Sequence, residues 1–240
     1  MMRFGKGAAA LAALLALGAA SPQKSAADPH NPTCPKEPDW GHDKAMTLTP
    51  ATRGGKRVLL AEGVIDPFLP DRMRAALEKD EMVEEVWLRS RGGDAEAGNE
   101  TGKVIRSYPG MLTRIPAGWT CFSSCNFVFM GGDRRHVEPG GHFMVHMFTY
   151  TGQRDVIAGS VKKGTEDTVE LIGEIEQLSA LLASEDNDFL IRMGVSRKLL
   201  TEVMYRQLAT GGKGGSGQRY CLSQDEVRKY NVMPVERAAN

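Results

Sequence analysis

Ser124 and His146 are the two residues in the middle of the chain whose types suit hydrolytic chemistry. Small polar residues precede an apolar run that Gly131-Gly132 ends, which predicts that Ser124 opens a helix. A hydroxyl at a helix start lies beside unpaired backbone N–H groups, which can stabilise an oxyanion formed when that hydroxyl attacks a carbonyl. Serine needs a neighbouring base, and His146, at the end of a strand-like stretch, is the nearest candidate. The alternative is that Ser124 merely caps the helix and His146 is a satisfied core histidine.

A glycine-rich turn, Ser90-Arg91-Gly92-Gly93, follows an apolar strand upstream. Together with Ser123-Ser124-Cys125 and Met144-Val145-His146, it resembles the motifs of the proteolytic subunit of the Clp protease, over roughly Arg57 to Val235. The resemblance implies that Ser124 is the nucleophile, His146 the base, and the amides of Gly93 and Cys125 the oxyanion hole. It also implies an α/β fold, a ClpP/crotonase-like spiral of ββα units in a single domain. Arg91 departs from the family, which usually has proline there, and the serine-to-histidine loop is a few residues shorter.

The acidic third residue of a triad has no clean counterpart. The resemblance places it near Thr201 to Met204, where Glu202 is the only acid. Asp186 and Asp188, at the end of a long predicted helix, are the alternatives, because a shift of one helical position swings a side chain by about 100°. A Ser/Lys dyad with Lys162 or Lys163 is a second catalytic arrangement.

Four cysteines, Cys34, Cys121, Cys125 and Cys221, allow three disulfide pairings. The preferred framework joins Cys121 to Cys125 and Cys34 to Cys221, because a cysteine in an irregular leader has little reason to be there unless it is tied to the body. Sequence alone leaves the other pairings open. Cys121-x-Ser123-x-Cys125 also resembles a motif of a little-described group of exported Clp-like proteins.

Metal binding is the competing interpretation of this cysteine- and histidine-rich stretch, which also contains His136 and His142. The spacing matches no zinc pattern, and an oxidising compartment disfavours free thiolates. We expect no metal and no other cofactor. His142 shares a strand face with His146 and is expected to line the cleft rather than act as the base.

The N-terminus has the form of a secretory signal peptide, with a basic start, a short apolar run from Ala8 to Ala20, and small residues before a break. Cleavage after Ala20 or Ala27 is expected; a retained anchor is the alternative. The domain organisation is therefore a signal peptide over 1–27, an extended leader over 28–56 and a ClpP/crotonase-like domain over 57–240. The protein is expected in the periplasm or secreted, with membrane contact only through an uncleaved signal segment.

Strand and helix patterns alternate after Arg57. Helix periodicity and caps predict helices from Pro70, over 95–107, over 165–192, over 198–208 and after a capping box at Ser223. Apolar runs predict strands over 58–61, 84–90, 111–115, 220–222 and 231–235. This order favours an α/β domain with largely parallel strands. The glycine-rich stretch 211–217 lacks the flanking pattern of a phosphate loop and is expected to be a surface loop.

The composition is electrically balanced, with 30 basic and 30 acidic residues. No charge field favours a nucleic acid partner. Apolar positions off the main stripe of the 165–192 helix favour a homo-oligomer.

Two functions from different classes fit these patterns. The first is an exported serine hydrolase, a peptidase that acts on a peptide or protein substrate through an acyl-enzyme. The second is a catalytically inactive ClpP-like binding or assembly module, favoured by the missing aspartate and by a disulfide beside Ser124.

Overall fold

The computed structural model describes residues 26–29, 31–148, 150, 153–209 and 219–234. A short hairpin, β1 (Ala27–Asp28) and β2 (Asn31–Pro35), precedes the main body. The first half of the body is β3 (Thr47–Arg53), β4 (Lys56–Glu62), α1 (Leu69–Lys79), β5 (Glu85–Arg89), α2 (Ala95–Arg106) and β6 (Leu112–Ile115). The second half is β7 (Thr120–Phe122), α3 (Cys125–Met130), β8 (Arg134–Val137), β9 (His142–His146), α4 (Arg154–Lys163), α5 (Thr165–Arg192), α6 (Lys198–Ala209), β10 (Arg219–Cys221) and α7 (Gln224–Lys229). The predicted single-domain α/β class is confirmed.

The strands form two principal sheets. The larger has the order β3-β4-β5-β6-β8, in which β4, β5, β6 and β8 run parallel and β3 pairs antiparallel at the edge. The smaller has the order β10-β9-β7. A bridge between Ser90 and Cys121 joins the end of β5 to β7. This junction brings the turn after β5 to the start of α3.

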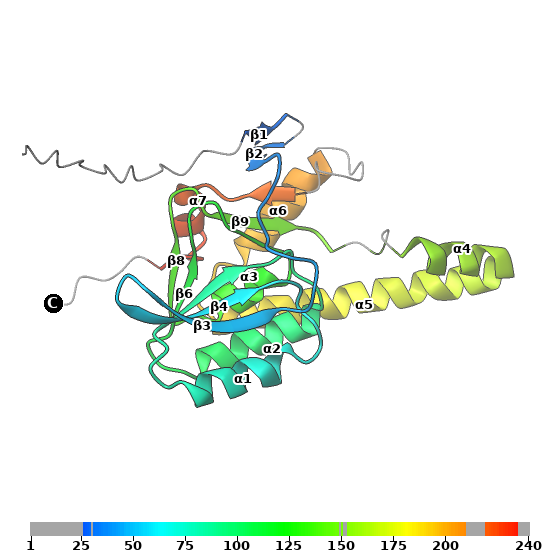
Figure 1. The fold of residues 1–240 in the computed structure, drawn as a ribbon. Coiled ribbons are helices and arrows are strands. Elements are labelled where there is room, and N and C mark those ends of the chain that lie inside the picture. The colour runs from blue at the N-terminus through cyan, green and yellow to red at the C-terminus, as the bar shows by residue number, and fades with distance from the viewer. Residues whose placement is uncertain (1–25, 30, 149, 151–152, 210–218, 235–240) are drawn as a thin grey trace, which may run out of the picture.

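Helix α2 positions α3 through unusually close backbone contact. A Cβ atom at Gly102 would lie 2.5 Å from the carbonyl oxygen of Phe127, and one at Gly131 would lie 2.2 Å from the carbonyl oxygen of Gly102. Real Cβ atoms do not approach other atoms so closely, so only glycine permits this packing. Close packing against α2 therefore fixes the position of α3. Helix α2 in turn lies beside α1 (Figure 1).

The buried side chain of Arg135 joins three chain segments at the far end of α3. Its guanidinium donates hydrogen bonds to the carbonyl oxygens of Met130 at 2.9 Å, Met193 at 3.0 Å and Asn231 at 3.1 Å. Burial, with the positive charge of Arg106 nearby, lowers the pKa of Arg135 to about 10. Arg135 remains charged at neutral pH and satisfies carbonyl groups at the ends of α3 and α5.

Two stretches differ from the sequence-based expectation. Residues 47–53, placed in an irregular leader, form β3, because the Gly54-Gly55 turn folds them back onto β4 and an edge strand accommodates Pro50. The strand predicted over 231–235 does not form across 231–234, where Asn231 adopts a left-handed φ of 56° that ends the preceding helix. The predicted signal peptide lies outside the described residues except for residues 26 and 27, and the 211–217 loop lies wholly outside them.

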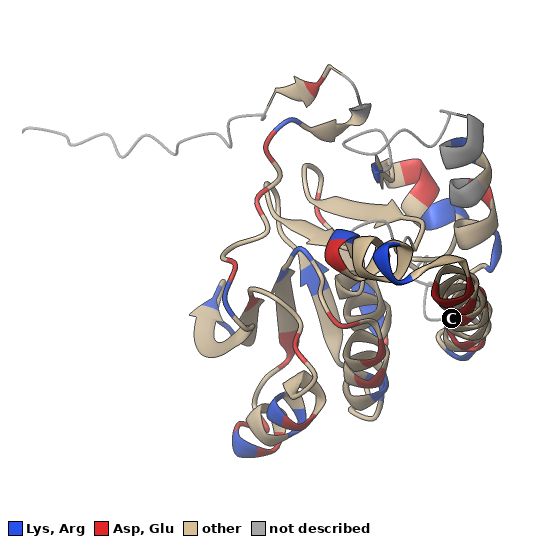
Figure 2. Ribbon diagram, turned by 90° about the vertical axis from the view of Figure 1, so that its right-hand side faces the viewer, with Lys and Arg blue, Asp and Glu red and all other residues tan. Residues whose placement is uncertain are grey.

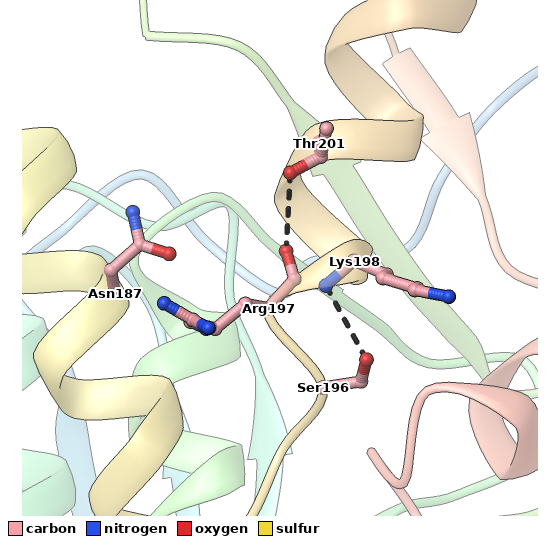
Figure 3. A pocket seen from close by; sticks show the side chains of 5 residues that line it. All are labelled: Asn187, Ser196, Arg197, Lys198 and Thr201. Atoms are coloured by element: carbon pink, nitrogen blue, oxygen red, sulfur yellow. Dashed lines mark hydrogen bonds between the residues drawn. The ribbon is translucent and has the colours of Figure 1, made fainter.

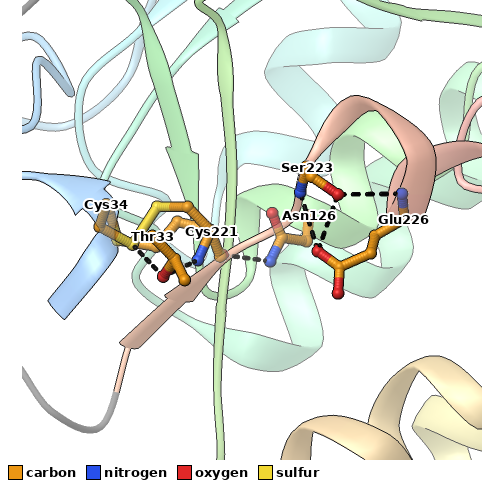
Figure 4. Close-up of a disulfide and its surroundings, with 7 residues drawn as sticks. Thr33, Cys34, Asn126, Cys221, Ser223 and Glu226 are labelled. Carbon is orange, nitrogen blue, oxygen red and sulfur yellow. Dashed lines mark hydrogen bonds between the residues drawn. A yellow bond between two sulfur atoms is a disulfide. The ribbon is translucent and has the colours of Figure 1, made fainter.

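The disulfides follow the preferred pairing, Cys34 with Cys221 and Cys121 with Cys125. Figure 4 shows the first bond joining β2 to β10, where the backbone N–H of Cys221 also donates to Thr33 Oγ1 at 3.3 Å. Cys34, Cys221 and Met144 form a small buried cluster of their own. The N-terminal hairpin is thus covalently tied to the sheet that carries His146.

Replacing both Cys34 and Cys221 with serine should lower the free energy of unfolding by about 2–4 kcal/mol, because the bond closes a long loop and restricts the unfolded chain. Urea unfolding of the oxidised wild type and the variant measures the difference. A difference near zero would mean that the hairpin is held by its non-covalent contacts alone.

Helices α4 and α5 project from the body as an antiparallel pair (Figure 1). Several large apolar side chains on them are exposed, among them Val161, Val169, Ile172, Leu178 and Leu181. Basic and acidic residues are interspersed over the ribbon in Figure 2, in keeping with the formal net charge of zero. Among the described residues, no helix combines the length and apolar character needed to cross a bilayer.

Candidate active site

Ser123 occupies a sharp turn between a strand and a helix. Strand β7 ends at Phe122, α3 begins at Cys125, and Ser123 between them adopts a left-handed φ of 59°. A non-glycine residue in this conformation is uncommon and marks local backbone strain, which clusters at functional sites. The same strand–turn–helix geometry exposes the nucleophilic serine in many hydrolases.

His146 contacts Ser123, and not the predicted Ser124. Its Nε2 atom lies 2.7 Å from Ser123 Oγ, close enough for a hydrogen bond. The Ser124 side chain is buried against α2, where a Cβ atom at Gly98 would lie 2.8 Å from Ser124 Cβ. Ser124 is already helical in its backbone angles and makes no side-chain cap. The predicted placement of Ser124 beside His146 is therefore wrong by one residue.

The imidazole of His146 packs against the aromatic ring of Phe122. The centroids of the Phe122 and His146 rings are 4.7 Å apart. Trp40 stacks on Phe122, with 6.3 Å between the ring centroids. Burial lowers the pKa of His146, and a backbone hydrogen bond with Met147 opposes this shift. The neutral imidazole, the form that can accept a proton from Ser123, is therefore favoured at neutral pH.

The rate of any reaction that requires neutral His146 should stay at its neutral-pH value until the pH falls below 6.5, the ordinary pKa of histidine. The sign follows from burial, because the protonated ring loses solvation and is formed only at lower pH. The rate of covalent labelling of Ser123, measured from pH 4.5 to 8, should have its acid limb below 6.5. A limb above that value would contradict the lowered pKa.

Two backbone amides lie free beside Ser123. Among the described residues, neither the N–H of Gly93 nor that of Ser124 donates to an acceptor. The turn that carries Gly93 is held by the Gly92 N–H, which donates to Ser90 Oγ at 3.0 Å. Gly92 has a φ of 86°, and a Cβ atom there would lie 2.7 Å from Ser123 Cβ, so glycine is required for the close approach.

Of the predicted oxyanion donors, Gly93 is at the site and Cys125 is not. Gly93 and Ser124 line the pocket beside Ser123, whereas Cys125 is absent from its wall. The reason is the same one-residue shift: once Ser123 is at the turn, the amide that follows it belongs to Ser124. Cys125 instead holds the turn covalently, because its bond to Cys121 closes a ring that contains Ser123.

No carboxylate hydrogen-bonds to His146 among the described residues. Glu202, predicted as the orienting acid, binds Lys229 Nζ at 2.8 Å and the Tyr230 hydroxyl, and it does not line the pocket. These partners lower the pKa of Glu202. The predicted position of Glu202 beside His146 is therefore wrong.

The other predicted site residues lie elsewhere, with one exception. Asp188, Lys162 and Lys163 are exposed and do not line the pocket, and neither does His142. Burial lowers the pKa of His142. Asp186 is the exception, because it lines the same pocket as Ser123 and His146. No group of three His, Cys, Asp or Glu side chains in the described part of the chain could hold a metal ion.

The pocket beside Ser123 has a volume of about 250 Å³. Helix α3 contributes Phe127 and Met130 to its wall, and β9 contributes Phe143 and Val145. Helices α5 and α6 close it with Leu182, Asp186, Leu199 and Leu200, and Phe148 lies at its edge with 49% of its surface exposed. A mostly apolar cavity beside a partly buried hydroxyl and a base could accommodate a substrate side chain.

A second hollow, about 430 Å³, lies between α5 and the start of α6 and contains neither Ser123 nor His146. Figure 3 shows its five lining residues, with Thr201 Oγ1 donating to the Arg197 carbonyl at 3.5 Å and the Lys198 N–H donating to Ser196 Oγ at 3.3 Å. The hydroxyl groups of Ser196 and Thr201 are thus engaged in the first turn of α6.

No family model matches the chain, and no curated protein matches it. Similar solved structures include a ClpP1 mutant from Listeria monocytogenes, with 14% identity and a TM-score of 0.46 over 73% of this chain and 88% of that one. A mutant of a membrane-bound stomatin-specific protease has 13% identity and a TM-score of 0.43 over 73% and 75%. An enoyl-CoA hydratase from Shewanella pealeana has 14% identity and a TM-score of 0.32 over 42% and 49%. Similarity of this extent carries no argument about activity, which has to come from the site.

Proposed function

We propose that this chain is an exported serine hydrolase, a peptidase of the ClpP/crotonase-like kind, with Ser123 as its nucleophile and His146 as its base. The observation that carries the proposal is the 2.7 Å contact between Ser123 Oγ and His146 Nε2 at a strained strand-to-helix turn. A serine that only capped a helix would not need the left-handed backbone or an imidazole within hydrogen-bond distance of its hydroxyl.

In the proposed reaction, His146 Nε2 accepts the Ser123 proton while Oγ attacks the carbonyl carbon of the substrate. The oxyanion accepts hydrogen bonds from the amides of Gly93 and Ser124. His146 then donates the proton to the leaving amine, which leaves an ester on Ser123. Water, deprotonated by His146, hydrolyses the ester and restores the hydroxyl.

Labelling with a fluorophosphonate probe tests the proposal. The probe phosphonylates activated serines, so peptide mapping by mass spectrometry should find one adduct, on Ser123. Prior unfolding of the protein should prevent the labelling. A folded protein without an adduct, and without hydrolysis of peptide and ester panels, would contradict the proposal.

The second candidate function is a binding or assembly module with the same fold. The specific observation in its favour is that no carboxylate of the described residues holds the His146 ring. Loss of that carboxylate costs a serine hydrolase several powers of ten in rate without abolishing the reaction. A weak but site-specific adduct on Ser123 would therefore still favour the hydrolase.

Export and self-association complete the proposal. Two disulfides and no free cysteine among the described residues support an oxidising compartment, periplasmic or extracellular. Mass spectrometry of exported material should find a chain that begins after Ala20 or Ala27. The exposed apolar side chains of α4 and α5 support a homo-oligomer, which light scattering would detect.

A further inference from the structure

Asp186 occupies a position of α5 at which an apolar residue is expected, on the helix face that packs against the body. Leu182, Asp186 and Phe189 follow one another at helical spacing and share the face that α5 turns toward the body. Leu182 lines the pocket beside Ser123, Phe189 is buried in the core, and Asp186 lies between them in the pocket wall. Among the described residues Asp186 has neither a salt bridge nor a hydrogen bond.

Two more polar atoms in the same wall lack partners. Asn126 donates through Nδ2 to the carbonyl oxygen of Met144 at 2.7 Å, which fixes its Oδ1 atom as a free acceptor. Ser124 Oγ is also without a partner. Both residues are more than nine-tenths buried, Asn126 with 6% and Ser124 with 3% of its surface exposed. Buried polar atoms without partners are rare and call for an explanation.

The ionisable residues in the wall of the pocket beside Ser123 include an acid but no lysine or arginine among the described residues. Apart from His146, Asp186 is the only titratable residue among the described residues that lines the pocket. Burial, and then the neighbouring Glu185, raises the pKa of Asp186 to about 7. Both effects favour the neutral acid, and a cation bound beside Asp186 would stabilise its charged form.

We propose that the pocket beside Ser123 binds a substrate side chain with an apolar stem and a cationic head, lysine or arginine, and that Asp186 pairs with the head. The inference rests on the proposed function and names its substrate class. The stem packs against Phe127, Met130 and Leu199, and the head lies among the acceptors Asp186 and Asn126. Lysine and arginine have this division between a hydrocarbon stem and a charged end.

Matched substrates test the selectivity. Two peptide esters that differ only in lysine or norleucine before the scissile bond present similar stems with and without the charge. Wild type should have a kcat/KM at least about 10-fold higher for the lysine ester, the range of a hydrogen bond to a charged group. Asp186→Asn should remove this preference, and Asp188→Asn, the same change at an exposed position of α5, should leave it intact.

A role for Asp186 in orienting His146 would change different measured rates. If Asp186 orients His146, Asp186→Asn should lower the rates for both esters and the rate of fluorophosphonate labelling by the same factor. That result would overturn the assignment of Asp186 to specificity. Unchanged labelling with loss of the lysine preference would support it.

Binding alone separates this inference from the proposed function. Ser123→Ala cannot form an acyl-enzyme, so calorimetric titration with the lysine and norleucine peptides measures the pocket without catalysis. The lysine peptide should bind at least about 10-fold more tightly, and Asp186→Asn in the Ser123→Ala background should remove the difference. Equal binding of the two peptides, or binding of neither, would overturn the inference even if Ser123 proves to be a nucleophile.

Discussion

Ser123→Ala should abolish fluorophosphonate labelling, whereas Ser124→Ala should leave it largely intact. Of the two serine hydroxyls, that of Ser123 lies 2.7 Å from His146 Nε2, whereas the Ser124 side chain is buried against α2. Removing a nucleophile that has no substitute costs on the order of 10⁴-fold or more in rate. The oxyanion donor at position 124 is a backbone amide, so alanine retains it. Labelling rates of the two variants, followed by gel fluorescence, make the comparison.

His146→Ala completes the test. It should reduce labelling as strongly as Ser123→Ala, and the double variant should be little worse than either single one, since the two side chains act as a unit. Near-UV circular dichroism must match that of the wild type, because His146 lies on a core strand. Full labelling of Ser123→Ala, with the adduct on Ser124, would restore the assignment made from the sequence.

Arg135→Met should lower the free energy of unfolding by about 3–5 kcal/mol. Methionine fills most of the space but donates no hydrogen bonds, so the carbonyl groups of Met130, Met193 and Asn231 would lose a buried donor. These groups end α3, end α5 and follow α7, so one substitution loosens three segments. Urea unfolding monitored by circular dichroism measures the loss.

Arg134→Met is the matched control on the same strand. Arg134 is exposed and donates to the carbonyl of Gly110 at 3.0 and 2.9 Å, and its loss should cost less than about 1 kcal/mol. Arg135→Lys, which keeps the charge but cannot reach all three carbonyls, should lie between the two. Equal losses for Arg134→Met and Arg135→Met would mean that the three contacts contribute nothing beyond a surface arginine.

Periodicity and caps were sufficient to predict most of the elements that position the site. Helix α1 has a proline in its first turn, α7 begins with a capping box at Ser223, and the apolar runs of β4 and β5 are buried as predicted. These signals are local, so the sequence contains them in full. The pairing of Cys34 with Cys221 was also accessible, because it was the partner left once Cys121 and Cys125 were joined.

The nucleophile was missed because periodicity does not fix a boundary to one residue. Ser123 and Ser124 are identical in type, and only the left-handed backbone of Ser123 turns its hydroxyl to His146. One signal pointed to it, the symmetric placing of Ser123 between Cys121 and Cys125. Asp186 could not be chosen over Glu202, because the wall of the pocket is assembled from α3, β9, α5 and α6, and sequence spacing does not measure distances between them.

The ring closed by Cys121 and Cys125 has a consequence for how the protein is produced. A bond between residues so close in sequence restricts the unfolded chain less than the Cys34–Cys221 bond does, so a preparation from a reducing cytoplasm that still folds would lack it without an obvious loss of structure. Such material would still carry Ser123 and His146, but its nucleophile would sit in an open loop free to leave the left-handed conformation. Activity measured on cytoplasmic material would then describe the open loop, and an inactive preparation would say nothing about the protein in its oxidised form. Thiol titration belongs before every assay.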